Sequence, residues 1–139
     1  MIKKIITGIT LSAAITFIFF SCKKESIEKC IAGTGGYVTL KIFLQHNEHA
    51  VVNLKNYRDT IYVKYNSREF PGSNPSLYDE IHIGDWPGDS VVIPNLRCGD
   101  YYIFGVGFES IHSYRVSGGI PFSTGQKNGE IRVTIPVSE

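Results

Sequence analysis

The sequence predicts an all-β protein, folded as a single antiparallel Greek-key β-sandwich of about seven strands. Three observations lead to this fold class. After residue 21 the chain holds only two alanines, whereas valine, isoleucine, threonine, tyrosine and phenylalanine, which favour strands, are abundant. Short runs alternate apolar and polar side chains, and no window repeats its apolar residues at helical spacing. Turn residues interrupt these runs about every dozen positions, a spacing typical of sandwiches.

The first half of the domain predicts three strands separated by two turn-rich segments. Two of these strands alternate apolar and polar residues, and the third is shorter and more polar, as an edge strand is expected to be. The second connection contains Pro71, Gly72 and Pro75, which predict a loop. In chain order the expected strands are residues 37–45, 59–65 and 78–83, and the connections are residues 46–56 and 66–76.

The second half predicts a central strand and three further strands. Residues 99–110 carry apolar side chains on both faces, which indicates a strand buried on both sides. Gly105 and Gly107 fall on one face of it, and this spacing predicts a bulge or the close approach of another backbone. Pro136 cannot donate a ladder hydrogen bond, so the last strand ends there or lies at an edge. The remaining segments are a turn at 84–89 and strands at 90–96, 113–123 and 129–137.

The N-terminus has the pattern of a secretory signal peptide. Lys3 and Lys4 precede sixteen uncharged residues, 5–20, fewer than the roughly 20 apolar residues of a membrane-spanning helix. Ser21 supplies the small residue expected at a cleavage site. With Cys22 directly after it, the junction resembles the lipobox of bacterial lipoproteins, in which a peptidase cuts before a diacylglyceryl-modified cysteine. A spanning anchor and ordinary secretion are the alternatives.

The resemblance to lipoproteins implies a location and a domain organisation. Two or three acyl chains on Cys22 would hold the protein stably at a bilayer. Lys23, rather than an aspartate, follows the cysteine, and the lipoprotein sorting rule then implies the outer membrane, with the leaflet left open. We expect a signal peptide at residues 1–21, a lipidated cysteine and tether at 22–36, and one β-sandwich domain at 37–139.

Charge argues against a nucleic-acid binder. The whole chain has a formal charge of +1. Because Lys3 and Lys4 belong to the leader, the remaining 118 residues carry 12 basic and 13 acidic side chains, a formal charge of −1. A nucleic-acid-binding domain normally has a basic face or a high isoelectric point. The length fits one domain with one core.

The cysteines divide into one for the lipid and two for a disulfide. Cys22 takes the lipid, which leaves Cys30 and Cys98 in an oxidising compartment where disulfides persist. By the chain-entropy estimate, closing this loop of nearly seventy residues would stabilise the fold by about 4 kcal/mol. Two unpaired thiols are the alternative. Neither cysteine has a second close Cys or His pair, so a metal site is not expected.

A motif near residue 96 resembles known sandwich families. A strand leading to Asn-Leu, a Gly-Asp turn and a tyrosine resembles the transthyretin-like sandwiches, including carboxypeptidase regulatory-like domains. The same stretch also resembles fibronectin type III domains, in which a tyrosine six positions after the leucine forms a tyrosine corner; Tyr102 has that spacing. The absence of the early fibronectin tryptophan favours the transthyretin-like fold. The residues of the motif are Asn95, Leu96, Gly99, Asp100, Tyr101 and Tyr102.

Aromatic residues in loops are the candidate ligand contacts. Trp86 lies in a glycine-bounded turn, where it could present a rigid aromatic ring to a glycan or a protein. Phe70, Tyr78 and Phe122 could extend such a surface. The alternative is that Trp86 folds back over one end of the sandwich as a core plug.

The sequence offers no pattern that predicts catalysis, a cofactor or a metal. His46 and His49 lack a nearby third ligand. Asp79 and Glu80 are adjacent, so in a strand they point to opposite faces and cannot act as an acid–base pair. No nucleophile elbow, P-loop or dinucleotide-binding fingerprint is present.

These observations predict a non-enzymatic, lipid-anchored β-sandwich that binds or assembles with an envelope protein or a glycan. Loops on a rigid scaffold would provide the recognition. The alternative is a periplasmic inhibitor or immunity-type protein that blocks an enzyme with one loop, either residues 69–76 or residues 84–89. An enzyme that uses the histidines is a third hypothesis.

Overall fold

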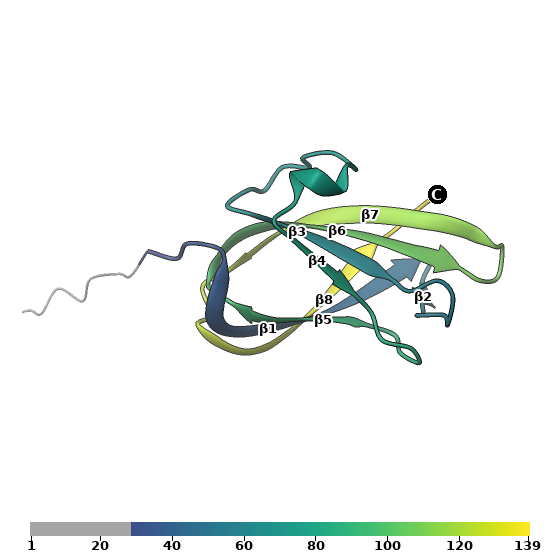
Figure 1. Cartoon of the computed structure of the whole chain (residues 1–139), viewed down its shortest axis with the longest axis horizontal. Coiled ribbons are helices and arrows are strands. Elements are labelled where there is room, and N and C mark those ends of the chain that lie inside the picture. Colours follow the sequence, from purple (N-terminus) through teal and green to yellow (C-terminus); the bar gives the residue numbers. More distant parts are fainter. Residues whose placement is uncertain (1–28) are drawn as a thin grey trace, which may run out of the picture.

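The computed structural model describes residues 29–139. They form two four-stranded sheets, which confirms the prediction of an all-β sandwich (Figure 1). This part of the chain has eight strands, because the connection expected to be irregular at 46–56 contains a three-residue strand. The first sheet contains β1 (Thr34–His46), β2 (His49–Val51), β5 (Val91–Leu96) and β8 (Asn128–Pro136). The second contains β3 (Thr60–Tyr65), β4 (Glu80–Ile83), β6 (Gly99–Glu109) and β7 (Tyr114–Thr124), and a 3₁₀ turn, η1 (Pro75–Leu77), lies between β3 and β4.

β1 is the centre of the first sheet. β8 pairs with one edge of it in parallel, while β5 and β2 pair antiparallel with successive parts of the other edge. The second sheet is antiparallel throughout, in the order β4-β3-β6-β7. An isolated bridge joins Ser117 of β7 to Ser138 beyond β8, so the two sheets meet along that side. β4 is left at the edge of the second sheet.

Alternate side chains of β1 fill the core, as the pattern predicted. Phe43 breaks the pattern by pointing to the outer side of the first sheet. There its ring lies against the cations of Lys41 and Arg132, whose charged groups are 5.5 and 5.8 Å from the ring centroid. The core residues of β1 are 0–1% exposed: Val38, Leu40, Ile42 and Leu44.

β6 is covered on both faces, as predicted for a central strand. Tyr101 and Ile103 point into the main core and are fully buried. Tyr102 and Phe104 point to the outer side of the second sheet, where they pack with Tyr78 in a smaller cluster. The outer cluster is why this strand contains no polar face.

The glycine pair of β6 makes room for side chains of the opposite sheet. The pairing of β6 with β3 and β7 runs without a register shift, so the predicted bulge is wrong. A Cβ on Gly105 would lie 2.5 Å from Leu44 Cδ2, and one on Gly107 would lie 2.8 Å from Val51 Cγ1. Side chains, several of them from the first sheet, therefore approach here, rather than a backbone.

The folded part of the chain begins earlier than the expected boundary at residue 37. Cys30 forms a disulfide with Cys98, Ala32 is 6% exposed, and β1 starts at Thr34. The Arg97 amide donates to the Gly33 carbonyl over 2.8 Å. Residues 30–36, predicted to belong to the tether, thus pack against the turn between β5 and β6.

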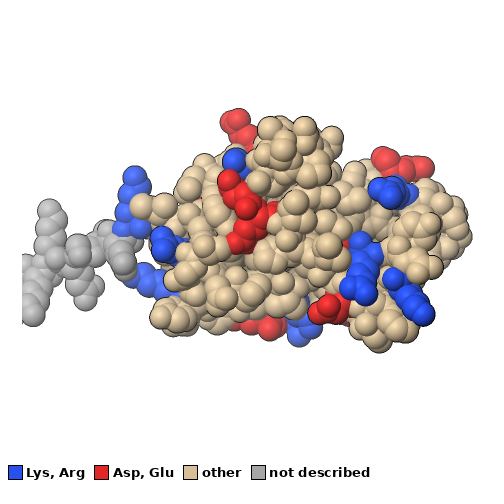
Figure 2. Space-filling view, in the orientation of Figure 1, with Lys and Arg blue, Asp and Glu red and all other residues tan. Residues whose placement is uncertain are grey.

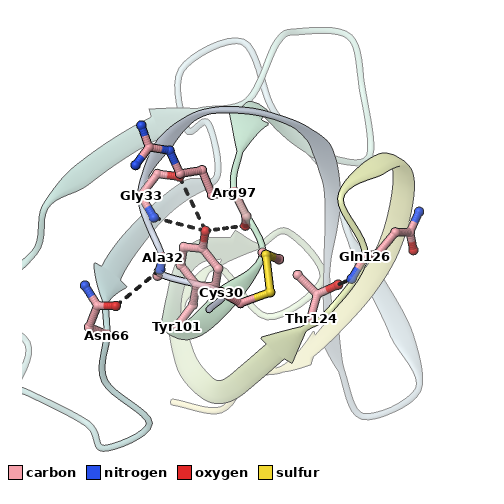
Figure 3. Close-up of a disulfide and its surroundings, with 9 residues drawn as sticks. Cys30, Ala32, Gly33, Asn66, Arg97, Tyr101, Thr124 and Gln126 are labelled. Atoms are coloured by element: carbon pink, nitrogen blue, oxygen red, sulfur yellow. Dashed lines mark hydrogen bonds between the residues drawn. A yellow bond between two sulfur atoms is a disulfide. The ribbon is translucent and has the colours of Figure 1, made fainter. Parts of the chain in front are cut away.

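The hydroxyl of Tyr101 joins this N-terminal segment to the same turn (Figure 3). It donates to the Arg97 carbonyl over 2.7 Å, accepts from the Gly33 amide over 3.2 Å, and lies 3.4 Å from the Gly33 carbonyl. Leu96 is fully buried beneath the turn, and Gly99 adopts φ +153° against Ala32. Of the two candidate tyrosines of the motif, Tyr101 makes the bonds to the backbone.

We expect Tyr101→Phe to lower the free energy of unfolding by about 1–3 kcal/mol, because buried backbone groups lose their partner. Tyr102→Phe is the matched control, since the structure shows no hydrogen bond from that hydroxyl to any described residue, and it should change stability by less than about 0.5 kcal/mol. Urea denaturation of the oxidised protein measures both. Equal losses in the two variants would contradict this assignment.

Candidate functional site

Exposed apolar side chains gather around the edge strand β4. Ile81 and Ile83 are 51% and 61% exposed and pair with Tyr62 and Thr60 of β3. Paired residues share a face, so both isoleucines lie on the outer side of the second sheet, beside the Tyr62 ring. With three neighbours from the flanking loops they form what we term the β4 surface. Its members are Phe70, Leu77, Ile81, Ile83 and Trp86.

The polar residues of β4 point inward, which inverts the usual pattern. Glu80 and His82 pair with Val63 and Ile61, whose side chains lie in the core. The two polar side chains bond to each other, with His82 Nε2 2.9 Å from Glu80 Oε2. Inward-pointing charge is a common protection of a sheet edge. In this strand it leaves the apolar residues to face outward.

The loop between β3 and β4 folds onto the outer cluster and supports Phe70. The Phe70 ring lies 5.7 Å from the Tyr102 ring and 5.3 Å from the Phe104 ring, yet 52% of the residue is exposed. Tyr78 donates its hydroxyl hydrogen to the Gly72 carbonyl over 2.7 Å, which closes the loop. Phe70 is thus held from below while part of it remains accessible.

The start of η1 and the residue before β4 fix the ends of this loop. Asn74 caps η1 by accepting from the Ser76 amide over 3.0 Å. Asp79 accepts from the Tyr65 amide over 2.7 Å and from Lys64 Nζ over 3.3 Å. A loop bonded in this way to β3 has little freedom to rearrange.

The loop between β4 and β5 exposes Trp86. The indole is 51% exposed, so the alternative of a core plug is wrong, and the Trp86–Pro87 peptide bond is cis. Asn53, which is 3% exposed, holds the loop through two hydrogen bonds. Its backbone N–H donates to the Gly88 carbonyl over 2.9 Å, and its side-chain Nδ2 donates to the Ser90 carbonyl over 3.2 Å. A buried polar residue thus anchors an exposed aromatic one.

The four predicted ligand contacts therefore separate into two groups. Trp86 and Phe70 are half exposed and belong to the β4 surface. Tyr78 is 9% exposed and supports Phe70 from within the outer cluster. Phe122 packs against the main core, with its ring 6.3 Å from the Tyr101 ring, and lies away from this surface.

Sequence reasoning missed three members of the β4 surface. Ile81 and Ile83 alternate with polar residues, which reads as an apolar face directed into the core, and Leu77 lies in a loop dominated by turn residues. The sequence did contain a signal for the orientation of this strand. Glu80 and His82 are two positions apart, which puts them on one face, where their side chains can pair with each other. Such a pair can occupy the inner side of an edge strand.

A buried carboxyl group lies behind Asn53. Asp59 is 1% exposed, its amide donates to Asn53 Oδ1 over 2.8 Å, and its carbonyl accepts from the Gly84 amide over 2.9 Å. Within residues 29–139 neither carboxyl oxygen has a hydrogen-bond partner. Burial raises the pKa of Asp59 to about 7. The ionised form of Asp59 therefore destabilises the folded state next to Asn53, the residue that holds the Trp86 loop.

The histidines of the described residues lie in different surroundings. His46 is 6% exposed and packs edge-on against Tyr114, with ring centroids 5.6 Å apart, whereas His49 is exposed. His112 Nδ1 lies 2.9 Å from Glu109 Oε2 in the turn after β6. Burial tends to raise the pKa of Glu109, but the amides of residues 111 and 112 and the imidazole of His112 lower it overall. Across the described residues, no group of three or more His, Cys, Asp or Glu side chains could hold a metal ion.

Two further findings bear on location and relationship. From residue 29 onward, no helix is long and apolar enough to cross a membrane; Cys22 and the predicted signal peptide lie outside the described residues. No protein-family model, curated protein or solved structure matches the chain. What the β4 surface does is therefore inferred from its own side chains.

We expect the stability of the protein to fall as the pH rises from 4 to 8 by an amount that depends on Asp59. Its folded-state pKa of about 7 lies above the ordinary value of 3.8, so its contribution is fully present below pH 4 and is lost as the pH rises through 7. The shift corresponds to about 4 kcal/mol between these limits. Asp59→Asn stays uncharged, so it should be more stable than wild type at pH 8 and differ less at pH 4.

The exposed Asp89→Asn in the same loop is the control for the loss of one carboxylate. Urea unfolding at several pH values provides the measurement. Parallel pH profiles for wild type and Asp59→Asn would show that the buried carboxyl does not titrate in this range.

Proposed function

We propose that this protein is a lipid-anchored, non-enzymatic module of the cell envelope that binds or assembles with a protein or glycan through the β4 surface. The β4 surface exposes five large apolar side chains on β4 and on the two loops that flank it, and exposed apolar surface beyond scattered single residues marks interaction sites. The observation that carries the proposal is the exposure of Trp86 on a loop anchored by buried Asn53. An aromatic group already held in place loses little conformational freedom when a partner binds.

The direction of the strands favours this use of the Trp86 loop. Ile83, just before the loop, pairs with Thr60, which also pairs with Val106 near the far end of β6. β6 begins at Gly99, beside Cys98 and the point where the N-terminal segment enters. If Cys22 holds that end at a bilayer, the loop that follows β4 lies at the end directed away from it (Figure 1).

We further propose that the strand connections are those of a Greek-key, transthyretin-like sandwich behind a cleaved lipoprotein signal peptide. The bond from Tyr101 to the Arg97 carbonyl supports the transthyretin-like alternative. In the fibronectin-like alternative Tyr102 would have that role, but its side chain lies in the outer cluster.

An inhibitor is the second candidate function. The Trp86 loop favours it, because an anchored turn with an exposed aromatic ring can enter a concave active site. The loop at 69–76 fits less well, since Phe70 packs partly on the outer cluster.

We expect the mass of the protein purified from membranes to equal residues 22–139 plus acyl chains. Cys30 and Cys98 should be alkylated only after reduction, because they form a disulfide. Intact-mass spectrometry before and after reduction measures both properties. A mass that retains Lys3 and Lys4 without lipid would contradict the anchor.

We expect Trp86→Ala and Ile83→Ser each to weaken binding of the envelope partner at least tenfold, since truncation of central aromatic and aliphatic contacts commonly costs this much or more. The partner is recovered by cross-linking in intact cells, and its affinity is then measured with purified components. Val92→Ser is the matched control, because Val92 is 52% exposed but lies on the first sheet.

The identity of the partner separates the two functions. A hydrolase that loses activity on binding would favour inhibition, whereas a glycan or an outer-membrane complex would favour the assembly module. Unchanged affinity in both β4-surface variants would overturn the assignment of this surface.

A further inference from the structure

The end of the sandwich where the chain enters is basic. Lys29, Arg97 and Lys127 line a hollow of about 480 Å³ next to the disulfide, together with Ile31 and Tyr37. None of the described residues that line it is acidic. Figure 2 shows Lys and Arg side chains at the left end of the described part of the molecule. We term this set of five residues the basic end.

The local backbone conformation leaves the side chain of Tyr37 exposed at this end. Thr34 and Val38 of β1 both pair with Leu96 of β5, so the intervening residues bulge away from the ladder. Gly35 adopts φ +85°, and a Cβ on Gly36 would collide with the backbone of β5. Only glycine at this position allows the backbone of β1 to pass so close to the backbone of β5. As a result Tyr37 is 81% exposed, the largest fraction among the exposed large hydrophobic side chains of the described chain.

The nearest acidic residue of the turn faces another way. Asp100 follows Gly99 and precedes the inward-pointing Tyr101, so it lies on the outer side of the second sheet. There it accepts a hydrogen bond from the Ser123 hydroxyl over 2.5 Å. Lys29 and Arg97 therefore give the basic end a local positive charge, although the chain as a whole is nearly neutral.

We propose that the basic end docks on the anionic headgroup surface of a lipid bilayer. Cations combined with exposed tyrosine and isoleucine suit an interface that is charged on one side and apolar on the other. The length of chain outside the structure favours the same occupant. Cys30 follows Cys22 by eight positions, and a fully extended chain of that length reaches at most about 29 Å. Within this span Lys23 and Lys24 are balanced by Glu25 and Glu28, so the positive charge of this end comes from Lys29 and Arg97.

This inference deepens the proposed function and rests on its lipid anchor for the orientation of the domain. Docking would fix the orientation: the basic end lies at the headgroups, and the Trp86 loop points away from the bilayer. The headgroup affinity of the basic end can be measured without the lipid, so a failed anchor and a failed docking surface give different results.

The test uses the unlipidated chain of residues 23–139, because the described residues 29–139 contain the whole core and the disulfide. Sedimentation with vesicles of phosphatidylcholine alone, or with 30% phosphatidylglycerol, measures binding at low and high salt. We expect binding to the anionic vesicles at low salt, little binding to the neutral ones, and loss at high salt.

Two charge-removing variants provide the matched comparison. Lys29→Gln with Arg97→Gln removes two cations from the basic end, and we expect a loss of roughly 25-fold in vesicle affinity, about fivefold for each cation near an anionic surface. Arg58→Gln with Arg115→Gln removes two cations near Phe108, at the opposite end of β6. This second pair should change affinity less than about twofold. Tyr37→Ser, which keeps every charge, should also weaken binding.

Several outcomes would overturn the proposal. Equal losses from the two charge pairs would mean that net charge, rather than the basic end, controls binding. Equal binding to neutral vesicles would exclude headgroup charge. Displacement by inorganic phosphate beyond the effect of sodium chloride at equal ionic strength would indicate a small-anion site instead of a bilayer surface.

Discussion

The hydrogen bonds of the Tyr101 hydroxyl are the interaction on which the arrangement of the chain depends. One buried oxygen bonds to the Arg97 carbonyl at the β5–β6 turn and to the backbone of Gly33, 68 residues away in sequence. The Cys30–Cys98 disulfide crosses between the same two segments and reinforces them covalently. Because the N-terminal segment is fixed here, β1 enters the first sheet with its aliphatic residues inward and can pair with β5 and β8 at once.

A second buried polar group, Asn53, organises the other end of the molecule. It fixes the loop after β4, and with it the only tryptophan of the chain. The Tyr101 hydroxyl and the Asn53 side chain both form hydrogen bonds to backbone groups that have no partner in a strand. A buried polar group is stable only when it has hydrogen-bond partners. The nearby Asp59 carboxyl lacks such partners, so the support of the Trp86 loop includes a group whose charging is unfavourable.

The two proposed surfaces are compatible with one orientation. The basic end and the β4 surface lie on different strands, and the Trp86 loop is at the opposite end of the second sheet from the disulfide. A domain held by lipid at one end, with headgroup contacts that limit its rotation, would direct the β4 surface to the side and the Trp86 loop outward. Binding of a partner would then need no conformational change, because hydrogen bonds already fix the loop before β4.

The sequence by itself determined the fold class and the approximate positions of seven of the eight described strands, and it favoured the Cys30–Cys98 disulfide over two unpaired thiols, because alternation, turn residues and cysteine usage are local or compositional signals. It also named Trp86 and Phe70 as candidate ligand contacts, and the structure shows that both are half exposed. Only the tertiary structure decided that Tyr101 rather than Tyr102 bonds to the backbone, that Phe122 belongs to the core, and that β4 faces its isoleucines outward. Which face of a strand is buried depends on its partners in the sheet, and a period of two leaves both assignments open. The partners of Glu80 and His82 resolved that choice, and they lie on another strand.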